Sequence, residues 1–408
     1  MDRPPSRAFQ GRKRQPIALQ RKKASVHICF LNMPIEYYSP TSGGAIATII
    51  MQTARELLAR GHKVTVLTPV NGDPLYDVGT VVPIDARQRH ELSLPQRALS
   101  RLRHKLNPWD YAYYEYYLGA FRRALKTLTP APDAVVCFND LVSPRYVKQI
   151  LPHARVLVNL QNEQGTRQTD MTEAIAAIDT FVACSRHIRN WTQNKYSVPD
   201  AKLTVINNGI DQSAFYPRPD FLAPNPRLKV LFIGRIDRNK GPDIAADAVG
   251  VLQREGLPVD FTVAGGLWFY GHGNEMADPF FRELKGKMDA VHADYKGHVT
   301  RPNVPALVRS QDVVCVLSRS HDPNPLVCLE GMASGCAVIG GDRGGIPDAF
   351  GEAGVLVDPD DFGAVVRTLR EWAVSPDALC EQKQKSVARA SRASWSANVD
   401  KLLPFLSA

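Results

Sequence analysis

Continuous apolar runs alternate with amphipathic segments along most of this chain. Residues 26–31 form the first run, Val-His-Ile-Cys-Phe-Leu, and such a run is typical of a strand that is buried on both faces of a parallel sheet. After a glycine-containing loop, apolar residues recur at helical spacing from Ile46 to Leu58, and a second apolar run covers residues 63–68. A strand, a helix and a second strand in this order predict a βαβ unit, and therefore a parallel sheet with helices on its faces.

The alternation continues in two successive series. In the first series we expect further strands at residues 134–138, 156–160, 180–184 and 203–206. The second series follows a proline-rich stretch and predicts strands within 227–236 and at 261–265, 312–317, 337–339 and 355–357, with helices at 242–254 and from about 329 to 334. We therefore predict an α/β fold of two parallel-sheet domains, with a first domain over 25–207, a linker over 208–226 and a second domain over 227–385.

The composition is that of an average globular protein. Of the 408 residues, 44% are apolar and 22% are charged. No apolar run approaches the ~18 residues that a membrane-spanning helix needs, and the basic N-terminus lacks the apolar segment of a secretory signal. The seven cysteines are scattered, mostly in apolar runs, without a Cys-x-x-Cys pair. We therefore expect buried thiols, no zinc site and a cytoplasmic protein.

The net charge of +9 belongs mainly to the N-terminus. Residues 1–23 hold eight Lys and Arg residues against Asp2, so they carry +7 and leave only +2 for the rest of the chain. We predict that residues 1–24 form a disordered basic tail, and attraction to anionic lipid is the second interpretation. Nucleic-acid binding is not expected, because neither a recognition motif nor interleaved aromatic residues accompany the charge.

One stretch, residues 85–128, has a different character. Basic residues come first and aromatic residues follow: Arg87, Arg89, Arg97, Arg101, Arg103 and Lys105, then Trp109, Tyr111, Tyr113, Tyr114, Tyr116, Tyr117 and Phe121. In one interpretation the stretch is an exposed helix pair that binds an acceptor or a membrane. Residues 87–121 and the basic tail would then make a peripheral contact with the inner face of the membrane. In the other, its helices pack their aromatic side chains on the first sheet and expose their arginines.

Loops that follow the strands carry the candidate chemistry, because open parallel sheets bind ligands at the carboxyl ends of their strands. Gly43 and Gly44 precede a helix, where backbone N–H groups can approach a phosphate, although a plain turn has the same sequence. Gly234, Arg235 and Lys240 follow the first strand of the second domain. The two cations suit a diphosphate, and the alternative is a solvated basic turn.

The loop and helix over residues 318–335 contain two acidic residues, Asp322 and Glu330. Leu326 and Val327 fall near the first turn of this helix, so we expect their backbone N–H groups to face the crevice. A carboxylate that is buried against a sheet is costly without a partner, and a pair of sugar hydroxyls is one such partner.

Together these motifs resemble the retaining glycosyltransferases of family 4, which have the GT-B fold of two Rossmann-like domains facing across a cleft. The family signature is an acid and a glutamate separated by seven residues, and here it runs from Asp322 to Glu330. Four other family motifs occur in the family order: Gly43-Gly44, Asn208-Gly209-Ile-Asp211, Gly234-Arg235 with Lys240-Gly241, and Gly344-Gly345-Ile-Pro-Asp348. The resemblance covers roughly residues 25–406, and residues 386–408 resemble a closing helix that packs back on the N-terminal domain.

The resemblance implies that a hexose-type sugar moves from a UDP or GDP sugar to an acceptor hydroxyl, with retention and with neither metal nor cofactor. The leaving phosphate would take the acceptor proton on the same face of the sugar, and the acceptor would be a saccharide, a lipid-linked glycan or a small metabolite. Arg235 and Lys240 would neutralise the diphosphate, Glu330 would hold the ribose, and Asp322 would hold the transferred sugar. The other donor-binding positions that the resemblance implies are Gly43, Gly44, Gly234, Val299, Asn324, Leu326 and Val327.

Three positions depart from the family pattern. Gln161 stands where the family often has a histidine, so we expect a catalytic hydrogen bond from a neutral amide to the donor sugar. Asp322 is one methylene shorter than the usual glutamate, and Pro325 replaces a glycine and removes one backbone N–H. These departures leave an alternative, a catalytically weak or silent homologue that binds nucleotide sugars. An epimerase or a phosphorylase on the same fold is the third reading.

Overall fold

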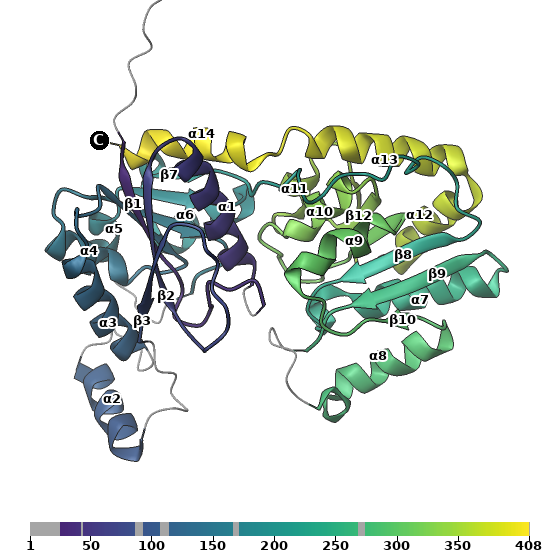
Figure 1. Cartoon of the computed structure of the whole chain (residues 1–408). Helices are drawn as coiled ribbons and strands as arrows, with labels where there is room; N and C mark the ends of the chain where they lie inside the picture. The colour runs from purple at the N-terminus through teal and green to yellow at the C-terminus, as the bar shows by residue number, and fades with distance from the viewer. Residues whose placement is uncertain are drawn as a thin grey trace, which may run out of the picture.

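The structure is a computed structural model, and it describes residues 25–41, 44–85, 93–106, 114–165, 171–267 and 274–407. Two parallel β-sheets, each packed against helices, form two α/β domains that lie side by side (Figure 1). The two-domain α/β architecture predicted from the hydrophobic pattern is therefore confirmed. The tail over residues 1–24 lies outside the described residues.

Seven parallel strands form the sheet of the first domain, in the order β3-β2-β1-β4-β5-β6-β7. They are β1 (His27–Leu31), β2 (Lys63–Pro69), β3 (Thr80–Ile84), β4 (Ala134–Phe138), β5 (Arg155–Leu160), β6 (Thr180–Ala183) and β7 (Leu203–Val205). Cys29 and Leu31 of β1 join one hydrophobic cluster, whereas Ile28 and Phe30 join another. Because successive side chains of a strand point to opposite faces, both faces of this sheet are buried, which explains the continuous apolar run.

Six parallel strands form the second sheet, in the order β10-β9-β8-β11-β12-β13. They are β8 (Leu228–Ile233), β9 (Val259–Ala264), β10 (Asp294–Tyr295), β11 (Val313–Val316), β12 (Ala337–Gly341) and β13 (Val355–Val357). In each sheet the strand order reverses beside the first strand, between β1 and β4 and between β8 and β11. Ligand sites of doubly wound sheets lie at this switch point, outside the carboxyl ends of the strands.

Helices connect the strands within both domains. The first domain contains α1 (Ala45–Ala59), α2 (Leu94–Leu106), α3 (Tyr114–Thr127), α4 (Ser143–Ile150), α5 (Thr172–Ala177) and α6 (Arg186–Tyr196). After these come α7 (Pro242–Arg254), α8 (Pro279–Ala290), α9 (Val304–Arg309), α10 (Leu326–Ala333), α11 (Ile346–Phe350), α12 (Phe362–Val374), α13 (Pro376–Ala390) and α14 (Trp395–Leu406). Helix α10 begins at Leu326, three residues earlier than its apolar pattern predicts, because Pro325 occupies the N-cap in an extended conformation.

The chain crosses between the domains twice, and the two crossings lie side by side. Ile210 of the first crossing donates its N–H to the carbonyl oxygen of Ala393 in the second (2.7 Å). A Cβ at Gly209 would lie 2.7 Å from the backbone nitrogen of Trp395, so this close approach requires glycine. Helix α14 then packs along the first domain, and Trp395 joins the hydrophobic cluster of β1 and α1 (Figure 1).

The described part of residues 85–128 forms α2 and α3. Tyr117 and Phe121 of α3 are fully buried in the core beside the first sheet, as the packing interpretation expects. Among the described residues, no helix has both the length and the apolar character that crossing a bilayer requires. Five of the basic and aromatic residues named for this stretch lie outside the described part of the chain: Arg87, Arg89, Trp109, Tyr111 and Tyr113.

Candidate functional site

A cleft between the two domains contains two adjoining pockets, each lined by loops that follow strands. The first, here called the Glu330 pocket, is lined among others by Thr41 and Thr48 of the first domain and by Gly234, Val299, Arg301 and Glu330 of the second. The second, here called the Asp322 pocket, is lined among others by Glu36, Gln161 and Asn208 on one side and by Lys240 and Asp322 on the other. Arg235, Leu326 and Val327 line both pockets, so the two are continuous.

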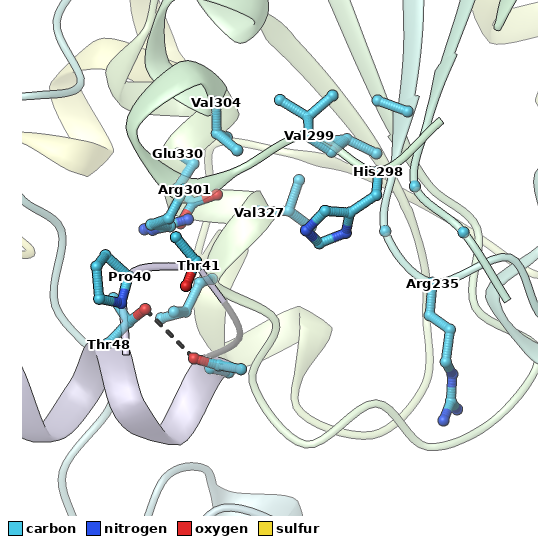
Figure 2. Close-up of a pocket in the computed structure, with 18 residues that line it drawn as sticks. Pro40, Thr41, Thr48, Arg235, His298, Val299, Arg301, Val304, Val327 and Glu330 are labelled. Carbon is cyan, nitrogen blue, oxygen red and sulfur yellow. Dashed lines mark hydrogen bonds and ion pairs between the residues drawn. The ribbon is translucent and has the colours of Figure 1, made fainter. Parts of the chain in front are cut away.

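An ion pair forms one wall of the Glu330 pocket, as Figure 2 shows. Glu330 lies on α10 and is 3% exposed, and its Oε1 lies 2.6 Å from Nη2 of Arg301. Burial alone would lower the pKa of Arg301, but the Glu330 carboxylate more than offsets this and raises it above its usual value. Apart from this ion pair, Oε1 of Glu330 accepts no hydrogen bond from the residues that the structure describes. A hydroxyl group of a ligand would find a buried carboxylate acceptor here.

Backbone atoms form the neighbouring part of this pocket. Gly234 and Gly265 follow β8 and β9, with φ angles of 155° and 134°. A Cβ at Gly265 would lie 1.8 Å from the carbonyl oxygen of Gly234, so the close approach of the two strand ends excludes any side chain there. His298 and Val299 lie on the loop beside them (Figure 2).

A second ion pair marks the Asp322 pocket. Asp322 follows β11 and is 6% exposed, and its Oδ2 lies 2.5 Å from Nζ of Lys240. Oγ of Ser318 donates to the same carboxylate oxygen (3.1 Å). A Cβ at Gly345 would lie 1.7 Å from the carbonyl oxygen of Pro323, so the predicted glycine turn packs directly against the Asp322 loop and supports it.

The first turn of α10 lies between the two ion pairs. Leu326 and Val327 occupy this turn, and no side chain caps it, so its leading backbone N–H groups are available to a ligand. Asn324, which the resemblance assigns to donor binding, donates from Nδ2 to the carbonyl oxygen of Cys184 in the first domain (3.0 Å). Its side chain therefore also joins the two domains beside the pocket.

Gln161 follows β5 and faces the Asp322 pocket from the first domain. Its Oε1 accepts from Nδ2 of Asn208 (3.0 Å), and its Nε2 donates to Oδ1 of Asn159 (2.7 Å). One N–H and one lone pair of the amide remain for a ligand, because each end of an amide has capacity for two hydrogen bonds. Asn208, on the first crossing, also donates to the carbonyl oxygen of Asn324 (3.3 Å), so it connects Gln161 to the second domain.

Arg235 belongs to the lining of both pockets and lies away from Glu330 (Figure 2). Its Nη2 lies 3.0 Å from Oδ2 of Asp237, and its side chain is 40% exposed. The guanidinium therefore has room to turn towards an anion in either pocket.

The N-terminus of α1 is occupied by a carboxylate that the sequence analysis did not single out. Oε1 of Glu36 accepts the N–H of Ala47 (2.8 Å), and it would lie 2.9 Å from a Cβ at Gly44. Gly43 lies outside the described residues. A phosphate at this helix end, which the glycine pair suggests, would therefore have to share the position with Glu36. Burial raises the pKa of Glu36 to about 7, and hydrogen bonds from the first turn of α1 offset only part of this rise.

The raised pKa of Glu36 predicts a pH-dependent loss of stability. Between pH about 4.5 and about 7 the folded state binds a proton at Glu36 that the unfolded state has released, so stability falls as the pH rises through this window. The rise in the pKa of Glu36 corresponds to a loss of about 3 kcal/mol at most in the free energy of unfolding. We expect Glu36→Gln to remove this fall, so that the variant gains stability over wild type at pH 8 but not at pH 4.5. Urea denaturation at both pH values measures the free energy of unfolding, and Glu352→Gln on the surface is the control. Equal dependence of this free energy on pH in Glu36→Gln and wild type would contradict the prediction.

Arg301 was also missed by sequence analysis, and so was the pairing of its side chain with Glu330. A weak signal existed, since Arg301 lies two positions after Val299, which the resemblance assigns to donor binding. Asp358 and Asp360, which formally make an Asp-x-Asp motif, both pair with Arg343 (2.8 and 2.6 Å) after β13. They line neither pocket.

Two family models match the chain, one over each domain. The model described as "Glycosyltransferase Family 4" matches residues 43–214, and the model described as "Glycosyl transferases group 1" matches residues 218–393. A D-inositol 3-phosphate glycosyltransferase of Thermomonospora curvata is 25% identical over 422 aligned positions, 93% of this chain and 93% of that protein. The protein of the same name from Thermobispora bispora is 30% identical over 223 positions, so that match spans about half of each chain (51% and 50%).

Solved structures show the same architecture. Sucrose-phosphate synthase from Thermosynechococcus elongatus superposes with a TM-score of 0.70 at 17% identity, covering 93% of this chain and 98% of that one. Anabaena Alr3699/HepE, solved in complex with UDP and glucose, superposes with a TM-score of 0.67 at 16% identity, with coverage of 93% and 98%. At these identities the likeness establishes the fold. With a matching family model over each domain and this two-domain fold, the chain belongs to glycosyltransferase family 4 and is a GT-B-fold glycosyltransferase that uses a nucleotide sugar.

Proposed function

We propose that this protein transfers a hexose-type sugar from a nucleoside diphosphate sugar to an acceptor hydroxyl, with retention of the anomeric configuration and without a catalytic metal. The observation that carries the proposal is the arrangement of the second domain's wall. The Glu330 carboxylate, the open first turn of α10 and the Asp322–Lys240 pair follow one another along one continuous cleft. In this order they suit a ribose, a diphosphate and a sugar.

Each group has a defined task in this mechanism. Glu330 accepts hydrogen bonds from the ribose hydroxyls, while Gly234 and Val299 leave room for the base. Lys240, Arg235 and the N–H groups of the first turn of α10 stabilise the diphosphate charge that grows as the bond to the sugar breaks. The acceptor oxygen bonds to the anomeric carbon on the same face, and the departing phosphate oxygen takes the acceptor proton. The protein supplies position and charge stabilisation, so no general base is required.

The experiment combines binding with turnover. Thermal-shift titration with UDP, GDP, ADP and dTDP should identify one preferred base, because a ligand present at 100 times its Kd stabilises the folded state by about 2.7 kcal/mol. Transfer from the matching nucleotide sugars is then followed by NMR, in the presence and absence of a chelator. Retained anomeric configuration in both conditions supports the proposal; an inverted product or a strict need for added manganese would overturn it.

Pro325, Asp322 and Gln161 keep a second candidate function open, a sugar-nucleotide-binding protein with little or no transferase activity. Pro325 withholds one N–H from the turn that faces the donor. Both candidates predict nucleotide binding, and turnover separates them. Binding without transfer across a broad set of donors and acceptors would favour the silent homologue.

The first domain's side of the Asp322 pocket indicates which acceptors fit. Among the described residues that line it there, the polar side chains are the Glu36 carboxylate and three amides, those of Gln161, Asn162 and Asn208. None of these side chains is a cation, so this wall suits neutral hydroxyl-rich acceptors, such as a saccharide, the sugar end of a lipid-linked glycan or a cyclitol. Transfer to a free polyol in preference to its monophosphate is the result to expect.

Gln161 provides a focused test of the first domain's contribution to holding the donor sugar. Gln161→Ala is expected to slow transfer about tenfold, because loss of a hydrogen bond costs about 0.5–1.5 kcal/mol and 1.4 kcal/mol corresponds to a factor of ten. The loss also leaves the Asn208 amide without the partner it has now. Steady-state kinetics with Gln149→Ala, an exposed residue of α4, as the control measures the effect. Unchanged transfer would place Gln161 outside the reacting site.

We also propose a cytoplasmic location with peripheral membrane contact through α2. Six of the seven cysteines are buried free thiols, which fits a reducing compartment. Helix α2 contains Arg97, Arg101, Arg103 and Lys105 but no acidic residue. Three of its leucines are exposed by 46–78% of their surface: Leu94, Leu99 and Leu102.

Vesicle sedimentation tests this membrane contact. The double variant Leu99→Glu/Leu102→Glu should bind anionic vesicles at least about tenfold less tightly, because it loses apolar insertion and gains repulsion from the lipid charge. Val374→Glu, an equally exposed apolar residue of α12 in the second domain, is the matched control. Equal binding of the double variant and wild type would exclude α2 as the contact.

A further inference from the structure

Three side chains with metal-ligating atoms meet at the edge of the cleft, outside both pockets. Glu163 lies on the loop after β5, His187 in the first turn of α6, and His321 on the loop after β11. Nε2 of His187 lies 2.6 Å and Nδ1 of His321 lies 3.7 Å from Oε1 of Glu163. The two imidazole rings lie 4.8 Å apart between centroids, and one ligand atom from each of the three residues falls within 4.8 Å of the other two.

Two imidazoles and one carboxylate are a ligand set for a particular class of metal. Zinc and its neighbours in the first transition series favour imidazole nitrogen, whereas magnesium and calcium favour an all-oxygen shell. Zn–N and Zn–O bonds are about 2.0–2.2 Å, so the ligands of a tetrahedral site lie about 3.3 Å apart. The distances between ligand atoms in this cluster, from 2.6 Å to at most 4.8 Å, lie on both sides of this value. His321 is 60% exposed and Glu163 35% exposed, so both side chains have room to adjust and to admit an ion.

The three residues come from both domains. Glu163 and His187 belong to the first domain, and His321 belongs to the second, one residue before Asp322. Direct contacts already join the domains nearby. Among them, Asn324 donates to the Cys184 carbonyl oxygen (3.0 Å), and Nε of Arg186 lies 2.6 Å from Oδ1 of Asp348. An ion held by the three ligands would add a stronger link at the same edge.

We propose that Glu163, His187 and His321 form a binding site for Zn²⁺ or a similar divalent transition metal that clamps the two domains together beside the cleft. Glu163 and His187 then stay close together within the first domain, and His321 completes the ligand set only when the two domains are in contact. The site is not part of the transfer chemistry, because Lys240 and Arg235 provide the charge at the donor. It acts instead on the opening and closing of the cleft, which donor entry and product release require.

Zinc binding to the full-length, metal-stripped protein tests the proposal. Titration with Zn²⁺ against a chromophoric chelator should show saturable binding of one ion per chain, with no competition from a large excess of Mg²⁺. His187→Gln and His321→Gln should each weaken binding by at least about tenfold, since even outer-shell partners of metal ligands are worth about 10–100-fold. His153→Gln, an exposed histidine elsewhere in the first domain, should not.

A second readout separates a clamp from a site within one domain. Small-angle X-ray scattering of wild type should show a smaller radius of gyration with Zn²⁺ than without it, and His321→Gln should lose this change. Circular dichroism confirms that each variant is folded. The proposal is overturned if Zn²⁺ does not bind, if the triple variant Glu163→Gln/His187→Gln/His321→Gln binds as well as wild type, or if His321→Gln leaves affinity and compaction unchanged.

Discussion

Replacing Asp322 with alanine is expected to slow sugar transfer by about 100-fold or more, because a hydrogen bond to a charged group is worth about 1.5–3 kcal/mol. In the proposed mechanism the Asp322 carboxylate holds the transferred sugar, so its loss acts on the transition state. Nucleotide affinity should stay within about threefold of wild type, since the nucleoside lies in the other pocket. Transfer kinetics and nucleotide titration on the same preparation measure the two effects.

The ion pair with Lys240 predicts the direction of any change in nucleotide affinity. Nζ of Lys240 lies 2.5 Å from the Asp322 carboxylate, and in Asp322→Ala it loses that partner. An unpaired ammonium is a better ligand for a diphosphate, so any change in nucleotide affinity should be a gain. Lys240→Ala should instead weaken the binding of the nucleoside diphosphate, whereas the free nucleoside should bind as before.

Asp358→Ala is the matched control for Asp322→Ala. Asp358 is an aspartate that also pairs with a cation, Arg343, but lies on the surface after β13 and lines neither pocket. Its replacement should leave transfer unchanged. The assignment of Asp322 to the sugar is wrong if folded Asp322→Ala protein loses more than tenfold in nucleotide affinity.

Glu330→Ala should give the opposite pattern, a loss of nucleotide and donor affinity of about 10–100-fold together. Glu330 is 3% exposed and is the only carboxylate among the described residues that line its pocket. Its removal takes away the ribose acceptor and also leaves the partly buried Arg301 guanidinium without its carboxylate partner, which is costly. Calorimetric titration with the nucleoside, the nucleoside diphosphate and the donor measures the loss for each part of the ligand.

A double-mutant cycle with Arg301 separates the two contributions. If Glu330 binds the ribose directly, the variant with both Arg301→Ala and Glu330→Ala should bind as weakly as Glu330→Ala. If Glu330 serves only to neutralise Arg301, the double variant should recover affinity. Glu255→Ala breaks a surface pair with Arg370 (2.6 Å) and is the control for loss of an ion pair as such. Unchanged nucleoside affinity in Glu330→Ala would refute the ribose assignment.

The elements of the two sheets could be predicted wherever the sequence has a local signal. The central strands are buried on both faces and therefore read as apolar runs, as β1 and β11 show. Two of the four edge strands, β3 and β10, were missed, whereas β7 and β13 were predicted. β3 has the sequence Thr-Val-Val-Pro-Ile and β10 has only two residues, Asp294 and Tyr295. A proline interrupts the apolar run of β3, and β10 is too short to show a run at all.

The same limit applies within the cleft. The glycine turns and the spacing between Asp322 and Glu330 are local features, and they identified the family and located the loops of both pockets. The partners of these two acids are distant in sequence: Lys240 lies 82 positions before Asp322, and Arg301 belongs to a different element from Glu330. No pattern among neighbouring residues of the sequence predicts such pairs.

By itself, then, the sequence determined the two α/β domains, the family and the loops that carry the chemistry, because hydrophobic periodicity and glycine requirements act between residues close along the chain. Only the tertiary structure decided which charges meet. It brought Glu36 onto the first turn of α1 and placed His321 beside Glu163 and His187 across the domain boundary. Electrostatic interactions depend on distance in space and on burial, and both are set by how the two sheets pack and not by the order of residues along the chain.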